Sequence, residues 1–352
     1  MHELDNYEPN VLLPLLYLLV IIYCFVAVVL PINLPLFRQD EFFALLFAST
    51  VIVICTATIH IVLSEALGPL TPAVAKAMLF SSSIIVLSFS SYIATEAYFA
   101  VKPAIPLINS HDYDQTIGKL QRELFYGISP SLWIIHQESR SELQMFDLAY
   151  NMFMPFLAAS LMIAVYVKGL KGGVQLSIAQ FIGLFVCLIV ALIFPTRGPI
   201  FQHPATFFPR LAHTMSGHLA EYLLVSARTY VQDPSRVPLL AGIAAMPSYH
   251  VFSWACGLMY WRHLPRWAFA IGILACALDW LSTVALGWHY ALDGAVALLL
   301  VYPAWKTSEC FMRLATPARA HAGATDGPAG PAPVRSTIEA PTPHATATRC
   351  WR

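Results

Sequence analysis

His289 and Asp293 stand four residues apart at the start of the last long apolar stretch of the chain. On a helix this spacing puts both side chains on one face, where the carboxylate can accept a proton from one imidazole nitrogen and leave the other as a nucleophile or base. A second histidine, His250, opens another apolar stretch after Pro247 and Ser248. A proline in the first helical turn and free backbone N–H groups favour phosphate binding. These residues therefore indicate phosphoryl chemistry.

Other interpretations of the polar residues remain open. Arg197 could stabilise charge on a transferring phosphoryl group, or it could be an interfacial arginine whose head reaches water. His289 with Asp293 could be a structural pair, and a lone membrane histidine such as His60 is more often a helix-packing hydrogen bonder. Asp279, inside an apolar stretch, is a functional candidate, but a hydrogen bond to Ser or Thr of a neighbouring helix explains it equally well.

The composition points to a membrane protein. Of the 352 residues, 58% are hydrophobic and 11% are charged, whereas roughly a quarter of a soluble domain is charged. A larger buried core cannot account for so few charged residues, because the ratio of surface to volume falls only slowly as a chain grows. Lipid must therefore be the solvent for much of the surface. The formal net charge of +0 gives no argument for nucleic acid as a partner.

The apolar pattern predicts an all-α, polytopic membrane helix bundle with eight spans, each of which needs about 20 residues. They run near 11–36, 42–64, 77–100, 148–167, 174–196, 239–261, 267–288 and 290–306. Pro247 could start a shorter helix within the sixth span. The polar connections between spans contain stretches typical of helices in the membrane interface, at 116–125, 132–146 and 216–230.

Basic residues in the short loops predict the orientation. They follow the fourth, sixth and eighth spans, at Lys168, Lys171, Arg262, Arg266, Lys306 and Arg313. The positive-inside rule makes this side cytoplasmic, so both termini are expected there. The three polar clusters around Arg197, His250 and His289 then share the outer face, which is periplasmic, extracellular or lumenal.

Four regions are expected along the chain. N-terminal transmembrane helices occupy 1–101, outer-side interfacial helices 102–147, a catalytic core 148–313, and a disordered cytoplasmic tail 314–352. The tail is rich in Ala, Pro, Thr and Gly and has no periodicity. No metal or cofactor is expected, because the spacing of the loop residues His203, His213, His218 and Glu221 matches no metal signature.

The last third of the chain resembles the type 2 phosphatidic acid phosphatase (PAP2) superfamily. Pro247, Ser248 and His250 are similar to the second motif of that family, P-S-G-H. The third motif reads S-R, five residues, H, three residues, D. The spacing of Ser282, Thr283, His289 and Asp293 is the same, and one helical hairpin separates the two motifs, as in the family.

The resemblance implies a six-helix core and a role for each matched residue. His289 would be the nucleophile that forms a phosphohistidine, Asp293 would orient it, and His250 would protonate the leaving group. The positions grouped around these three as substrate-binding are Arg197, Pro247, Ser248, Tyr249, Thr283 and Tyr290.

The motifs also depart from the family pattern. Tyr249 replaces a glycine, and Thr283 replaces the third-motif arginine. The chain has no clear first motif of the form K-x6-R-P, and residues 197–199 are its nearest substitute. These departures resemble the branch that contains fungal inositol phosphorylceramide synthase and related sphingolipid synthases. Cations from the second polar connection could replace the missing charge, at Arg210, Arg228 or Arg236.

The function expected is transfer of a phospho-headgroup between lipids through a phosphohistidine at the outer membrane face. The substrates would be a phospholipid or lipid phosphate and an acceptor lipid alcohol. A lipid phosphate monoester phosphatase is the alternative, because water or an alcohol can resolve the same intermediate. A transporter or a non-catalytic scaffold is the remaining class. The oligomeric state is not predicted.

Overall fold

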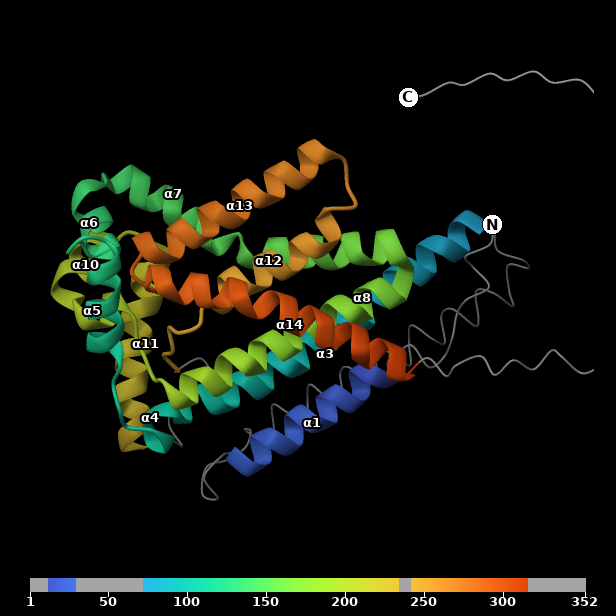
Figure 1. The fold of residues 1–352 in the computed structure, drawn as a ribbon, viewed down its shortest axis with the longest axis horizontal. Helices are drawn as coiled ribbons and strands as arrows, with labels where there is room; N and C mark the ends of the chain where they lie inside the picture. The colour runs from blue at the N-terminus through green and yellow to red at the C-terminus, as the bar shows by residue number, and fades with distance from the viewer. Residues whose placement is uncertain (1–11, 30–71, 234–241, 316–352) are drawn as a thin grey trace, which may run out of the picture. The chain divides into compact units, whose positions relative to one another are not determined.

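The computed structural model describes residues 12–29, 72–233 and 242–315 (Figure 1). All regular secondary structure in these ranges is helical, so the prediction of an all-α membrane helix bundle is confirmed. The predicted span at 42–64 and the predicted tail, apart from its first two residues, lie outside the described ranges.

Three helical stretches in the described part of the chain are long and apolar enough to cross a membrane: Ser83–Ile108, Arg140–Ile193 and Arg266–Ala285. The first begins within α3 (Pro72–Val101) and continues through the short helices after it, the second combines α7 (Arg140–Asn151) with α8 (Phe153–Ile193), and the third is α13 (Arg266–Ala285). A shorter apolar helix, α1 (Leu13–Val29), falls within the first predicted span.

The long helix α8 is the centre of the packing and contains two of the predicted spans. Its helical backbone is interrupted at Lys168 and at Gly169, whose φ of 61° favours glycine. The segment after this turn is buried on two sides. One side packs against α1 and α3 through residues such as Phe181, and the other packs against α12 and α14 (Ala291–Ala315) through residues such as Ala179.

Helix α12 (Tyr249–Trp261) has 13 residues and is shorter than the predicted span at 239–261. The chain from 242 to 248 is not helical; there the backbone of Ala245 and Met246 donates to the carbonyl and hydroxyl of Thr196, at 2.8 and 2.9 Å. Pro247 explains the late start, because proline lacks an N–H group and disfavours helical backbone in the residue before it. Ser248 then caps the helix.

Short helices gather at one end of the long ones, opposite the turns at 168–169 and 262–265 (Figure 1). They are η2 (Lys102–Ala104), α4 (Ile105–Ile108), α5 (Asp114–Leu124), α6 (Pro130–Gln137), α7 (Arg140–Asn151), α9 (Pro199–Gln202), α10 (Pro204–Leu211) and α11 (Met215–Gln232). Helices are therefore confirmed in the three stretches predicted to be interfacial, and their place in the membrane interface stays a prediction.

A separate hydrophobic cluster holds these short helices together. It combines residues of α6, α7, α9, α10 and α11 with Leu286 and Trp288, which lie in the turn between α13 and α14. This cluster therefore fixes the turn that carries His289.

Candidate active site

His289 lies in the turn between α13 and α14, one residue before Tyr290. Its backbone N–H donates to the carbonyl of Thr283 at 3.1 Å. Gly287, with a φ of 76°, lets the chain reverse there. The expectation that His289 and Asp293 share one helical face is therefore wrong in detail, because Asp293 is in the first turn of α14 and His289 precedes the helix.

Asp293 nevertheless reaches His289 from within the helix. Its Oδ2 lies 3.4 Å from His289 Nδ1 and accepts a hydrogen bond from the backbone N–H of Tyr290 at 2.8 Å. A carboxylate in a first helical turn commonly reaches back in this way. The Nδ1 atom is completely buried, so the 10% of the His289 side chain that is exposed lies elsewhere on the ring.

His250 is held between two aromatic rings at the start of α12. Tyr150 of α7 stacks on one face, with centroids 4.4 Å apart and an interplanar angle of 9°. Phe153 of α8 stacks on the other at 4.0 Å and 20°. The stack fixes the plane of the imidazole and leaves two orientations, related by a half-turn about the Cβ–Cγ bond. The group that faces Nδ1 therefore selects the direction of Nε2.

That group is Asp279 of α13. Its Oδ1 lies 3.7 Å from His250 Nδ1, and the carboxylate is buried. Neither oxygen has a hydrogen-bond partner among the described residues. A buried carboxylate is costly unless it is paired, so the contact with His250 is the compensation that the structure offers. Of the two sequence interpretations of Asp279, a Ser or Thr partner is wrong for the described residues.

The site thus contains two histidine–carboxylate pairs. The rings of His250 and His289 are 6.5 Å apart between centroids. The backbone N–H of Ser248 donates to the carbonyl of Asp293 at 3.2 Å, which fastens the start of α12 to the start of α14. The start of α12 and the turn before α14 therefore bring His250 and His289 close together.

The predicted substrate-binding residues of α12 and α13 have other contacts. The hydroxyl of Thr283 donates to the carbonyl of Trp280 at 2.7 Å, and Ser248 Oγ accepts the N–H of Val251 as the helix cap. Tyr249 donates to Gln180 Oε1 of α8 at 3.3 Å. Pro247 is buried beside them. None of these side chains is brought to the histidines by a described contact, and their binding roles stay predictions.

Arg197 is paired with carboxylates of the chain itself. Its guanidinium bonds Asp112 and has Nε 3.6 Å from Asp114 Oδ2. Burial raises the pKa of Asp114, although hydrogen bonds from the backbone of Gly198 and Arg197 lower it. Burial also acts to raise the pKa of Asp112, but hydrogen bonds from Asp114 and the charge and hydrogen bond of Arg197 outweigh it and leave the pKa below its ordinary value.

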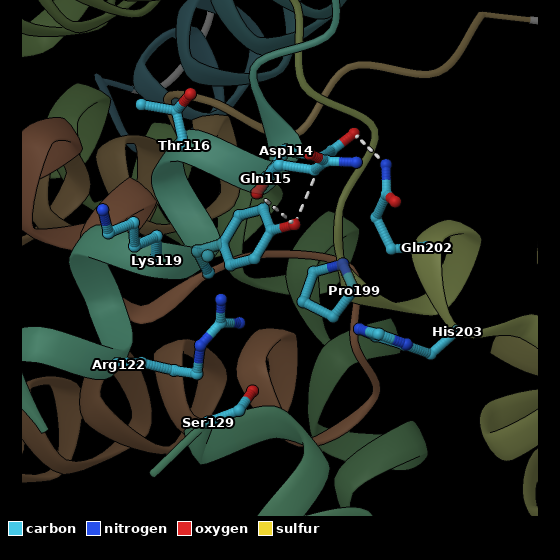
Figure 2. A pocket seen from close by; sticks show the side chains of 11 residues that line it. Asp114, Gln115, Thr116, Lys119, Arg122, Ser129, Pro199, Gln202 and His203 are labelled. Atoms are coloured by element: carbon cyan, nitrogen blue, oxygen red, sulfur yellow. Dashed lines mark hydrogen bonds between the residues drawn. The ribbon is translucent and has the colours of Figure 1, made fainter. Parts of the chain in front are cut away.

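Asp114 connects α5 to the turn that carries His289. Its oxygens accept from the backbone N–H groups of Arg197 and Gly198, from Gln202, and from the hydroxyl of Tyr290 at 2.9 Å (Figure 2). Gln121 of α5 accepts the backbone N–H of Ala291 at 2.6 Å. The sequence contained no signal for this role, since nothing local links Asp114 to a loop more than 80 residues away.

The described residues define an all-helical membrane protein whose candidate active site joins two histidine–carboxylate pairs. The family model of the PAP2 superfamily matches residues 115–307. The chain belongs to the PAP2 superfamily. No curated protein and no solved structure matches it. The matched region begins in α5, so it includes the helices that surround the turn of His289 as well as the motifs.

Proposed function

We propose that this PAP2-superfamily protein transfers a phospho-headgroup from one lipid to another through a phosphohistidine on His289. The observation that carries the proposal is the pair of imidazoles, 6.5 Å apart, each with a buried carboxylate beside its Nδ1. Phosphoryl transfer needs an attacking and a leaving atom roughly in line on opposite sides of phosphorus. Two imidazoles this close can supply the attacking nitrogen, from His289, and the proton for the leaving oxygen, from His250.

In the first step Nε2 of His289 attacks phosphorus while the bond from phosphorus to the lipid oxygen breaks. His250 gives its Nε2 proton to that oxygen, and the lipid alcohol leaves. Asp293 accepts a hydrogen bond from Nδ1–H of His289, which keeps the proton on Nδ1 and leaves Nε2 available as the nucleophile. In the second step His250 removes the proton of the acceptor hydroxyl, which attacks phosphorus and regenerates His289.

Transfer and hydrolysis differ only in the acceptor of the second step. A lipid alcohol gives headgroup transfer, and water gives a phosphatase. Tyr150, Phe153 and Trp288 place aromatic surface around His250. This surface favours an apolar acceptor over water, and it supports transfer as the leading proposal with the lipid phosphate phosphatase as the alternative.

The test is a lipid profile of the protein in nanodiscs that contain phospholipids, a lipid monophosphate and acceptor lipid alcohols. With a diacyl phospholipid as donor, mass spectrometry should detect diacylglycerol together with a new headgroup-bearing lipid. His289→Ala should abolish both products, because His289 forms the covalent intermediate. Free phosphate in place of a new lipid would establish the phosphatase. Identical profiles for wild type and variant would exclude the enzyme proposal and favour a transporter or scaffold.

A further inference from the structure

A pocket of about 530 Å³ lies between α5 and α9. Thr116, Lys119 and Arg122 line it from α5, and Pro199, Gln202 and His203 face them from the other side (Figure 2). The volume falls within the range of small-molecule sites, roughly 300–1,000 Å³. Nothing in the proposed chemistry at His289 uses this space.

The pocket is positively charged. Its lining contains two cations, Lys119 and Arg122, and a single carboxylate, Asp114. Both oxygens of Asp114 already accept hydrogen bonds from the protein, and the nearby guanidinium of Arg197 offsets any charge it carries. The charge that remains for a ligand is that of the two cations.

Neither Lys119 nor Arg122 makes a strong ion pair with another described residue. Lys119 lies 4.0 Å from Glu123, with side chains 75% and 63% exposed, and such surface pairs contribute little. Arg122 forms no ion pair with any described residue; its Nη1 lies 3.6 Å from the point where a Cβ on Gly118 would stand. The ring of Tyr290 lies 3.7 Å from the same point, so Arg122 and Tyr290 border the hollow left by this glycine.

Tyr290 joins the pocket to the reacting centre. It lines the pocket and directly follows His289 in the chain. The hydrogen bonds from Tyr290 to Asp114 and from Ala291 to Gln121 hold α5 against this segment. A ligand in the pocket therefore lies against the residue that directly follows His289 in the chain.

We propose that this pocket is a second anion subsite, which holds a phosphate group of the substrate headgroup other than the phosphate that reacts. Lys119 and Arg122 bind it through charge-assisted hydrogen bonds, with Thr116 and Ser129 as additional donors. The substrate class is then a lipid with two phosphate groups, either a diphosphate or a phosphodiester with a phosphorylated headgroup. The assignment to a substrate rests on the proposed function, but the anion site itself does not.

The binding experiment uses His289→Ala protein in nanodiscs, so that no turnover occurs, and inorganic pyrophosphate as the probe. Lys119→Gln together with Arg122→Gln should weaken binding by about tenfold or more, because a hydrogen bond to each charged group is lost. Gly118→Leu, which fills the hollow without changing charge, should weaken it as well. Arg140→Gln, at the exposed arginine that begins α7 outside the pocket, is the matched control and should have no effect. Equal binding by all four proteins overturns the subsite.

The lipid experiment compares a lipid diphosphate with the monophosphate of the same tail. The double substitution should raise KM for the diphosphate by about tenfold or more and change KM for the monophosphate by less than about twofold. Equal effects on both lipids, with pyrophosphate binding still weakened, would mean a site for free anions and overturn the substrate assignment. If the wild type turned over no lipid at all, the proposed function would fail. Binding of the lipid diphosphate to the His289→Ala protein, with and without the double substitution, would then decide the subsite.

Discussion

The two catalytic histidine candidates are held in different ways. His289 is positioned by its own segment, since Asp293 lies beside its Nδ1 and accepts a hydrogen bond from the backbone N–H of Tyr290. His250 is positioned by other helices, through two stacked aromatic rings and the carboxylate of Asp279. A carboxylate that accepts the proton on Nδ1 leaves Nε2 as the nitrogen that exchanges a proton with substrate. Asp279 is thus the proposed positioning residue of the general acid.

Replacement of Asp279 should affect proton donation selectively. We expect Asp279→Asn to lower kcat on a lipid substrate by about 10- to 100-fold with little change in KM, because general acid catalysis contributes roughly 10²- to 10⁴-fold. On an aryl phosphate, whose leaving group needs no proton, the loss should shrink to a few-fold. The measurement is the ratio of kcat values on the two substrates.

Asp293→Asn is the matched control for this experiment. It should slow both substrates to a similar extent, because either leaving group is displaced by the same attack of His289. If Asp279→Asn also slowed both substrates equally, its role would be structural and the assignment of His250 as proton donor would lose its support.

At the scale of elements, the segment 196–198 is the junction that brings together α5, α12 and the turn that carries His289. Thr196 pairs with the chain before α12, and Gly198 donates to Asp114. Gly198 has a φ of 99°, and a Cβ there would stand 2.5 Å from the carbonyl oxygen of Trp288. Glycine is therefore required both by the backbone angle and by the close approach of the turn that carries His289.

Gly198→Ala should destabilise the protein by about 1–3 kcal/mol and lower activity, because Trp288 and His289 must move away from the new methyl group. Thermal unfolding and turnover in nanodiscs are the two measurements. Gly127→Ala is the control, since Gly127 also has a positive φ, 89°, but nothing lies within 4 Å of its Cβ position. It should be destabilised by strain alone and keep its activity; equal losses of activity in both variants would contradict the role given to the junction.

At this scale the sequence could predict features that depend on local pattern, but not contacts that depend on tertiary packing. The spacing of His289 and Asp293 lies within one turn of chain, and Pro247 marks the start of α12 locally, so both were accessible. The contact between His250 and Asp279 depends on how α12 and α13 are rotated about their axes, which side-chain packing decides. The bond from Arg197 to Asp114 spans 83 residues, and no periodicity in either segment indicates it.

At the scale of the whole molecule, the short helices and the candidate site lie at one end of the long helices, and the turns at 168–169 and 262–265 lie at the other (Figure 1). The basic residues of those turns predict that their end is cytoplasmic. The arrangement of the described helices is compatible with this orientation, because it separates the two sets of residues along the helix axes.

Cysteine labelling tests the orientation. Glu123→Cys, at an exposed position of α5, should react with a membrane-impermeant maleimide in intact cells. His263→Cys, in the exposed turn after α12, should react only after permeabilisation. Labelling of the parent chain measures the contribution of the native cysteines. The opposite pattern would put the site on the cytoplasmic face.

The length of α12 has a consequence for how a lipid meets the enzyme. Thirteen residues rise about 20 Å, whereas the hydrocarbon layer is about 30 Å thick. If Arg262 at the far end lies at the cytoplasmic boundary, His250 stands some 10 Å below the opposite boundary, within the depth of the acyl chains. The scissile bond of a lipid must then sink toward the histidine, or the bilayer must thin around the protein. This is a case of hydrophobic mismatch, and it makes bilayer thickness a determinant of the reaction.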